Sequence, residues 1–257
     1  VTCPGNGLGN TVIDQGHLLV IPLEVRTPRM GLTLSSPTPL DIATPRLDIY
    51  LSTPTPQEPS TLDRTVGLFS NTTGYENTAY GFQSLFSNTT GRDNTANGAW
   101  SLYSNTTGIA NTAYGYSTLQ SNTTGNSNTA NGYYALNANT TADYNTANGQ
   151  YALYANTTGE SNTANGASAL ISNITGNYNT ANGGSSLYNN TLGEETAVGY
   201  NSLSNNTTGS NNTAIGQYAL VFNTIGQYNT ANGGSSLYNN TTGNYNTALG
   251  YLAGSGI

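Results

Sequence analysis

The stretch 122–138 reads NTTGNSNTANGYYALNA, and near-copies of it fill most of the 257-residue chain. Successive copies begin 17 residues apart, except for one step of 16, in which Glu194-Glu195-Thr196 lacks the asparagine that usually precedes the threonine. A fixed period of this kind indicates a repeat architecture. The copies begin at Asn71, Asn88, Asn105, Asn122, Asn139, Asn156, Asn173, Asn190, Asn206, Asn223 and Asn240.

The repeat is too short for a helical hairpin, which needs about 34 residues. Glycine, asparagine and threonine are also poor helix formers. We therefore expect an all-β fold, a parallel β-solenoid or β-roll of eleven coils of 17 residues. In each coil, one strand would point alanine inward and a second strand would point leucine inward. The Asn-Thr-Thr-Gly corner would use a positive φ at its glycine and an asparagine side chain bonded to nearby backbone.

The expected core is a ladder of one alanine and one leucine per coil. Burying a leucine contributes about 1.5–3 kcal/mol, whereas ordering each residue costs about 1–2 kcal/mol. So thin a stack favours further burial, and aromatic residues near each leucine could cover the coil itself or contact another chain. The core ladder begins with Ala79, Ala96, Ala113, Ala130, Leu85, Leu102, Leu119 and Leu136, and the aromatic residues include Phe86, Trp100, Tyr103, Tyr154, Tyr188 and Tyr238.

Residues 1–66 differ from residues 67–257, because they hold all nine prolines and the only histidine, cysteine and methionine. Apolar alternation at 18–25, 32–34 and 47–51 predicts short strands separated by proline-containing turns. These strands are too few for a core of their own. We expect a Pro-rich N-terminal arm that packs on a neighbouring protomer by strand addition, followed by the solenoid domain.

Charge and composition exclude several classes of protein. The net charge is −7, lysine is absent, and no basic patch for phosphate exists, so nucleic-acid binding is not expected. No run of about 18 apolar residues predicts a membrane span. Cys3 is the only cysteine, so no disulfide forms within one chain. The start at Val1 suggests N-terminal processing, most simply removal of a secretion signal, and predicts an extracellular or cell-surface protein.

No catalytic, cofactor-binding or metal-binding constellation emerges, and we expect a protein that is not an enzyme. His17 is the only imidazole and lies beside an apolar run. Four acids, Glu76, Asp93, Asp143 and Glu160, fall at one corner of the repeat. They could form a weak cation-binding line, but serine, asparagine and glutamine at the equivalent positions favour a solvated face.

The corner asparagines match the acceptor motif for N-glycosylation, which would suit a secreted fibre. Alternatively, they form a ladder that bonds the turn, and glycans about 4.8 Å apart on one line would collide. The regular rows of threonine and asparagine also suggest an ice-binding surface, although each strand has only one threonine that points outward. The candidate glycosylation residues are Asn71, Asn88, Asn105, Asn122, Asn139, Asn156, Asn173, Asn206 and Asn240.

The Asn-Thr-Ala-x-Gly core is clearest at Asn212-Thr213-Ala214-Ile215-Gly216 and at Thr196-Ala197-Val198-Gly199. It resembles the head repeats of trimeric autotransporter adhesins, and more closely the repeat arrays of bacterial and phage tail-fibre-like surface proteins. The resemblance covers residues 67–257 and implies a left-handed parallel β-roll, usually trimeric, that binds host or matrix surfaces. The present unit is longer than the adhesin repeat, and no heptad stalk follows it.

These observations predict a structural subunit of an extracellular filament or surface fibre. The last copy carries no charged or Pro-rich cap, so we expect copies of the chain to join head to tail, with the arm on the neighbouring protomer. The alternative is a trimeric adhesin or tail-fibre-like segment that binds surface carbohydrate or matrix. An ice-binding solenoid is a third hypothesis, and an enzyme of the pectin-lyase type is disfavoured. No cofactor is expected.

Overall fold

The computed structural model describes residues 12–14, 17–19 and 67–256, and the chain divides into two units, Val1–Asp48 and Ile49–Ile257. In the first unit, β1 (Val12–Asp14) and β2 (His17–Leu19) form an antiparallel pair. The predicted strand at 18–25 overlaps β2 at its first two residues. The rest of that strand, the predicted strands at 32–34 and 47–51, and Cys3 lie outside the described residues.

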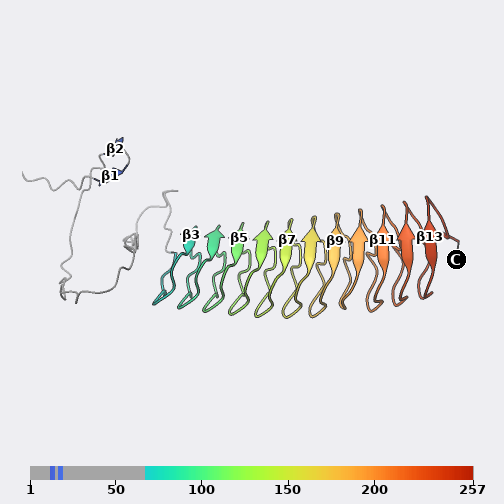
Figure 1. Cartoon of the computed structure of the whole chain (residues 1–257), viewed down its shortest axis with the longest axis horizontal. Helices are drawn as coiled ribbons and strands as arrows, with labels where there is room; N and C mark the ends of the chain where they lie inside the picture. The colour runs from blue at the N-terminus through green and yellow to red at the C-terminus, as the bar shows by residue number, and fades with distance from the viewer. Residues whose placement is uncertain (1–11, 15–16, 20–66, 257) are drawn as a thin grey trace, which may run out of the picture. The chain divides into compact units, whose positions relative to one another are not determined.

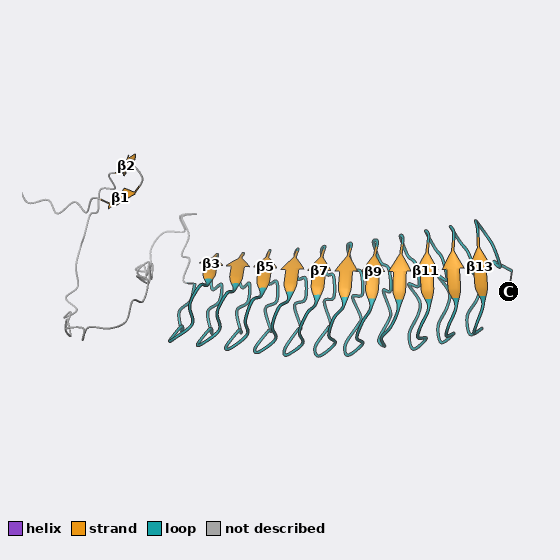
Figure 2. Cartoon of the chain, viewed as in Figure 1, coloured by secondary structure: helices purple, strands orange, loops and turns teal. Residues whose placement is uncertain are grey.

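The second unit is a parallel β-solenoid, as predicted (Figures 1 and 2). Its eleven strands pair in chain order, with threonine beside threonine and alanine beside alanine in every pair. No helix occurs in residues 67–256. The strands are β3 (Thr78–Tyr80), β4 (Thr95–Asn97), β5 (Thr112–Tyr114), β6 (Thr129–Asn131), β7 (Thr146–Asn148), β8 (Thr163–Asn165), β9 (Thr180–Asn182), β10 (Thr196–Val198), β11 (Thr213–Ile215), β12 (Thr230–Asn232) and β13 (Thr247–Leu249).

The interior of the solenoid holds the predicted alanine and leucine rows. Ala79 in β3 is half-buried against them, and the other seven named core residues have no exposed surface. The side chain before each leucine, such as Ser101 or Ala135, is buried as well. Each strand thus contributes its central alanine to the core and turns its threonine toward the outside.

The expected second strand is wrong, because each leucine lies in a turn. Leu136 has φ 49° and Tyr134 has φ 57°, so two residues of this turn adopt the left-handed conformation. A non-glycine residue in this region costs about 1–3 kcal/mol. The cost is offset by bonds between coils: the Leu136 N–H donates to the Ala152 carbonyl at 3.0 Å, and the pattern recurs along the rod.

The expected positive φ at the corner glycine is also wrong. That glycine is absent in the coil 139–155, where Ala142 replaces it. The positive φ falls instead on the glycine two residues after the core alanine, as at Gly132 with φ 140°. A Cβ on Gly132 would lie 2.5 Å from the Gly149 carbonyl oxygen of the next coil. Glycine is needed here for both backbone conformation and close coil-to-coil approach.

Candidate functional sites on the solenoid

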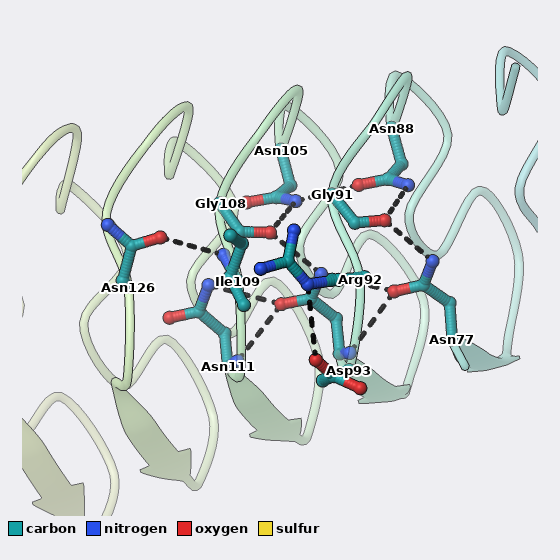
Figure 3. A network of polar contacts seen from close by, with 11 residues as sticks. Asn77, Asn88, Gly91, Arg92, Asp93, Asn105, Gly108, Ile109, Asn111 and Asn126 are labelled. Carbon is teal, nitrogen blue, oxygen red and sulfur yellow. Dashed lines mark hydrogen bonds and ion pairs between the residues drawn. The ribbon is translucent and has the colours of Figure 1, made fainter. Parts of the chain in front are cut away.

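Two rows of buried asparagine run along the rod beside the apolar core (Figure 3). In the first row, Asn105 Nδ2 donates to Asn88 Oδ1 at 2.8 Å and to the Gly108 carbonyl at 3.1 Å. In the second, Asn111 donates to Asn94 Oδ1 through its backbone N at 2.9 Å and through Nδ2 at 3.2 Å. In both rows the asparagine bonds its neighbour in the previous coil, which satisfies these buried amides.

We call these rows the first and second asparagine ladders. The first comprises Asn71, Asn88, Asn105, Asn122, Asn139, Asn156, Asn173, Asn190, Asn206, Asn223 and Asn240. The second comprises Asn77, Asn94, Asn111, Asn128, Asn145, Asn162, Asn179, Asn212, Asn229 and Asn246, with Glu195 between Asn179 and Asn212. Sequence reasoning missed the second ladder, although the asparagine that recurs before Thr-Ala was its signal.

The candidate glycosylation residues all belong to the first ladder. Asn71 is half-buried, and the other eight are buried. Nδ2 is the atom to which an N-linked glycan is attached, and here it donates hydrogen bonds inside the stack, as at Asn122. A glycan on any of the eight would displace these bonds and the adjoining coil. The fold thus favours the alternative reading, a hydrogen-bonded ladder.

The coil 190–205 is one residue shorter than the others, and the missing residue lies in its corner rather than before Thr196. Glu195 holds the asparagine's place in the second ladder: its N–H donates to Asn179 Oδ1 at 3.1 Å. In the corner, Asn190 Nδ2 donates to the Leu192 carbonyl, two residues ahead instead of three, at 2.6 Å. The shortening breaks the first ladder, because Asn173 Oδ1 is buried without a hydrogen-bond partner.

Glu195 is the one fully buried acid of the described residues. Its carboxyl group accepts from Asn212 N at 3.0 Å, from Asn212 Nδ2 at 3.1 Å and from Asn206 Nδ2 at 3.4 Å. Burial raises the pKa of Glu195 to about 8, against the opposing effect of these hydrogen bonds. Near neutral pH the carboxyl is therefore largely protonated and uncharged, as the asparagine that it replaces would be.

A shallow groove of about 390 Å³, open to solvent, lies over the shortened corner. It interrupts the repeating surface, and its rim carries two well-exposed apolar side chains, Tyr178 and Leu192. The groove is lined by Thr175, Gly176, Asn177, Tyr178, Leu192, Gly193, Glu194, Ser210 and Asn211.

Apart from Glu195, which stands in the second ladder, the charged residues of the solenoid lie at the corner between the two ladders. We call this the charged corner: Glu76, Arg92, Asp93, Asp143, Glu160 and Glu194. Arg92 Nε lies 3.7 Å from Asp93 Oδ2 and its guanidinium 5.7 Å from the centre of the Tyr75 ring. A hydrogen bond to Asp93, and the charge of that carboxylate, raise the pKa of Glu76. Asp143 instead accepts from the Asn126 backbone N at 2.6 Å.

The four predicted corner acids therefore form one close pair and two separate residues. Within residues 12–14, 17–19 and 67–256, no group of three histidine, cysteine or acidic side chains is placed to hold a metal ion. The arrangement matches the solvated-face interpretation better than a cation-binding line. His17 lies in β2.

Aromatic rings gather on another side of the coils and form what we call the aromatic face. Phe69, Phe86 and Tyr103 stack nearly parallel, with ring centroids 5.0 and 5.4 Å apart. The remaining rings form a continuous series of contacts across five coils. Many of them remain exposed; Tyr133 keeps 44% of its surface. The aromatic face comprises Phe69, Phe82, Phe86, Trp100, Tyr103, Tyr116, Tyr133, Tyr134, Tyr151 and Tyr154.

The rings thus cover one another along the rod, which is one of the two predicted roles, while their outer edges stay exposed. Later in the rod, Tyr238 packs on Phe222 with centroids 5.0 Å apart, and Tyr188 is exposed. Partial desolvation, together with Tyr151, Tyr134 and Tyr116, raises the pKa of Tyr133. This phenol therefore stays neutral at physiological pH.

The geometry defines a class, a parallel β-solenoid with asparagine ladders. Comparison with protein-family models, with curated proteins and with solved structures finds no match to this chain. The resemblance to adhesin and tail-fibre repeats therefore stays a prediction from the repeated motif. Within the described part of the chain, no helix is long and apolar enough to cross a membrane.

Proposed function

We propose that this chain is a structural subunit of an extracellular filament or surface fibre, in which copies join head to tail. The observation that carries the proposal is the register of the stack: every strand pairs with its neighbours threonine to threonine and alanine to alanine, and the short coil keeps this register. A surface that fits the next coil within a chain also fits the first coil of another copy. Such a heterologous contact generates an open filament.

The two ends of the described stack match in this sense. In the interior, each second-ladder asparagine donates to the side-chain oxygen of the preceding coil, as Asn246 does to Asn229 at 3.0 Å and Asn212 does to Glu195. By the same geometry, Asn77 faces a preceding coil and Asn246 Oδ1 faces a following one. The edge of β13 has no strand partner among the described residues beyond β12. Leu249 in β13 and Tyr251 just after it are 78% and 77% exposed.

The arm of residues 1–66 is proposed to lock this joint on the neighbouring protomer. It carries the prolines and the short strand pair, and an exposed strand edge accepts added strands. The protein would act in the extracellular space or at the cell surface, without a cofactor and without enzymatic activity. A surface of amides, hydroxyls and aromatic rings, with its charged side chains confined to one corner, supports a static rather than a catalytic role.

Electron microscopy of the full chain tests this proposal, with one edge variant and its control. Thr247→Pro removes the β13 N–H that would donate to a following coil, whereas Thr247→Val keeps it. We expect long filaments for the full chain and for Thr247→Val, and short rods for Thr247→Pro and for the chain without residues 1–66. Discrete trimers in every sample would overturn the filament and favour the trimeric adhesin or tail-fibre-like segment.

A further inference from the structure

Five tyrosines of the aromatic face lie in one cluster over three successive coils: Tyr116, Tyr133, Tyr134, Tyr151 and Tyr154. We propose that this tyrosine cluster is a site of oxidative cross-linking, in which phenol rings of adjacent coils join through a carbon–carbon bond. The modification would link one coil covalently to the next. It does not depend on filament formation.

Proximity is the first support. Tyr133 and Tyr151, in neighbouring coils, have ring centroids 5.6 Å apart, and Tyr134 and Tyr151 are 5.8 Å apart with planes inclined by 17°. Tyr116 and Tyr133 are 5.5 Å apart. Each tyrosine of the cluster therefore has another ring whose centroid is 5.6 Å away or closer.

Access is the second support. Tyr116, Tyr133 and Tyr154 keep 37%, 44% and 37% of their surface exposed, so an oxidant in solution can take an electron from these rings without unfolding of the chain. The aromatic face carries no charged side chain that could repel a charged oxidant.

The chemistry requires a peroxide and a haem peroxidase as the oxidant. Each of two phenols loses one electron and one proton to give a phenoxyl radical. The two radicals couple at the ring carbons ortho to oxygen, and each ortho hydrogen then shifts to oxygen to restore the aromatic ring. The two electrons and two protons reduce one hydrogen peroxide to two waters. The product is a dityrosine that joins two coils.

Two other exposed tyrosines provide a matched control. Tyr80 in β3 and Tyr114 in β5 are 69% and 43% exposed, but Asn97 of β4 separates them and neither packs on another aromatic ring. Neighbouring groups held on one scaffold meet at an effective concentration on the order of millimolar. At micromolar protein, coupling inside the cluster should exceed coupling between chains by about a thousandfold.

The acidic residues of the chain allow a direct readout. Cleavage before aspartate cuts the solenoid at Asp93 and at Asp143, which places Tyr133 and Tyr134 in fragment 93–142 and Tyr151 and Tyr154 in fragment 143–257. A cross-link between coils keeps these two fragments joined on a denaturing gel. Phenylalanine substitutions retain the stacked rings and remove only the reactive phenol, so the variants are expected to fold.

The experiment treats micromolar full-length chain with a haem peroxidase and hydrogen peroxide, then cleaves before aspartate. We expect the joined 93–142/143–257 product, dityrosine fluorescence and an unchanged yield on dilution, both for the natural chain and for Tyr80→Phe/Tyr114→Phe. The product should disappear in Tyr151→Phe/Tyr154→Phe. Absence of the product in the natural chain, its persistence in Tyr151→Phe/Tyr154→Phe, or its loss on dilution would each overturn the proposal.

Discussion

The regular coil 122–138 and the short coil 190–205 reach the same stacked geometry by different means. In the regular coil, Asn122 and Asn128 each bond the preceding asparagine. In the short coil, one corner residue is missing, Glu195 replaces an asparagine, and Asn173 Oδ1 is left without a partner. The strands on either side remain in register, Thr196 beside Thr180 and Thr213. The difference shows that strand pairing, and not the corner, sets the alignment of the coils.

The largest expected effect is a pH dependence of stability that comes mainly from the short coil. The folded-state pKa of Glu195 is about 8, above the ordinary 4.5, so the folded state holds a proton that the unfolded chain releases. The stability contribution is fully present below pH 4.5, falls as the pH rises through about 8, and is level beyond that. At about 1.36 kcal/mol per pKa unit, the loss reaches up to about 5 kcal/mol.

Urea unfolding between pH 4 and pH 9 measures this slope, and hydrogen exchange of residues 173–212 locates it. Glu195→Gln keeps the shape and removes the titration, so its unfolding free energy should vary far less over the same range. An equal slope in both proteins would contradict the assignment of the proton to Glu195.

The second prediction compares the two glycine positions of the regular coil. Gly132→Ala forces alanine to φ 140° and drives its Cβ toward the Gly149 carbonyl, at a cost of about 2–4 kcal/mol. Gly125→Ala should cost less, because Ala142 already occupies the equivalent position one coil later. Thermal unfolding of the two variants tests the order, and a larger loss for Gly125→Ala would reverse it.

A substitution in the regular part of the second ladder gives the third prediction. Asn128→Leu leaves the Asn145 N–H without its acceptor, now at 2.9 Å, and should destabilise the fold by about 1–3 kcal/mol. The control is Asn131→Leu, three residues away on the exposed side of β6, which should change stability by less than about 0.5 kcal/mol. Denaturant unfolding of both variants gives the comparison; similar losses would remove the ladder's special role.

The smallest expected effect comes from repairing the short coil. A threonine inserted after Thr191 restores the usual Asn-Thr-Thr corner and allows Asn190 Nδ2 to donate to Asn173 Oδ1. One restored hydrogen bond should stabilise the chain by about 1 kcal/mol. Hydrogen exchange should slow in residues 173–193, and unchanged exchange there would show that the break has no energetic cost.

Much of the fold could be predicted from the repeat. Ala130 and Leu136 recur at a fixed interval because they fill one interior, and the all-β stack follows from that period. The local backbone conformation could not be predicted, because leucine has no intrinsic preference for a φ near 50°. Stacking between the coils imposes that φ. Burial of the corner asparagines was equally hidden, since Asn122 would read the same on an exposed turn. The place of the missing residue could not be predicted either, because it follows only from the position of Glu195 in the second ladder.

The shortened corner has a consequence for how this chain can be altered. Between Asn190 and Leu192 the backbone lost a residue without moving the rows of threonine and alanine on either side. Length at that corner is therefore uncoupled from the pitch of the stack. The same bend in any other coil is a natural point for inserting a foreign peptide, which would project sideways at a spacing set by the choice of coil. A rod of this kind could display inserted segments along one line at regular intervals.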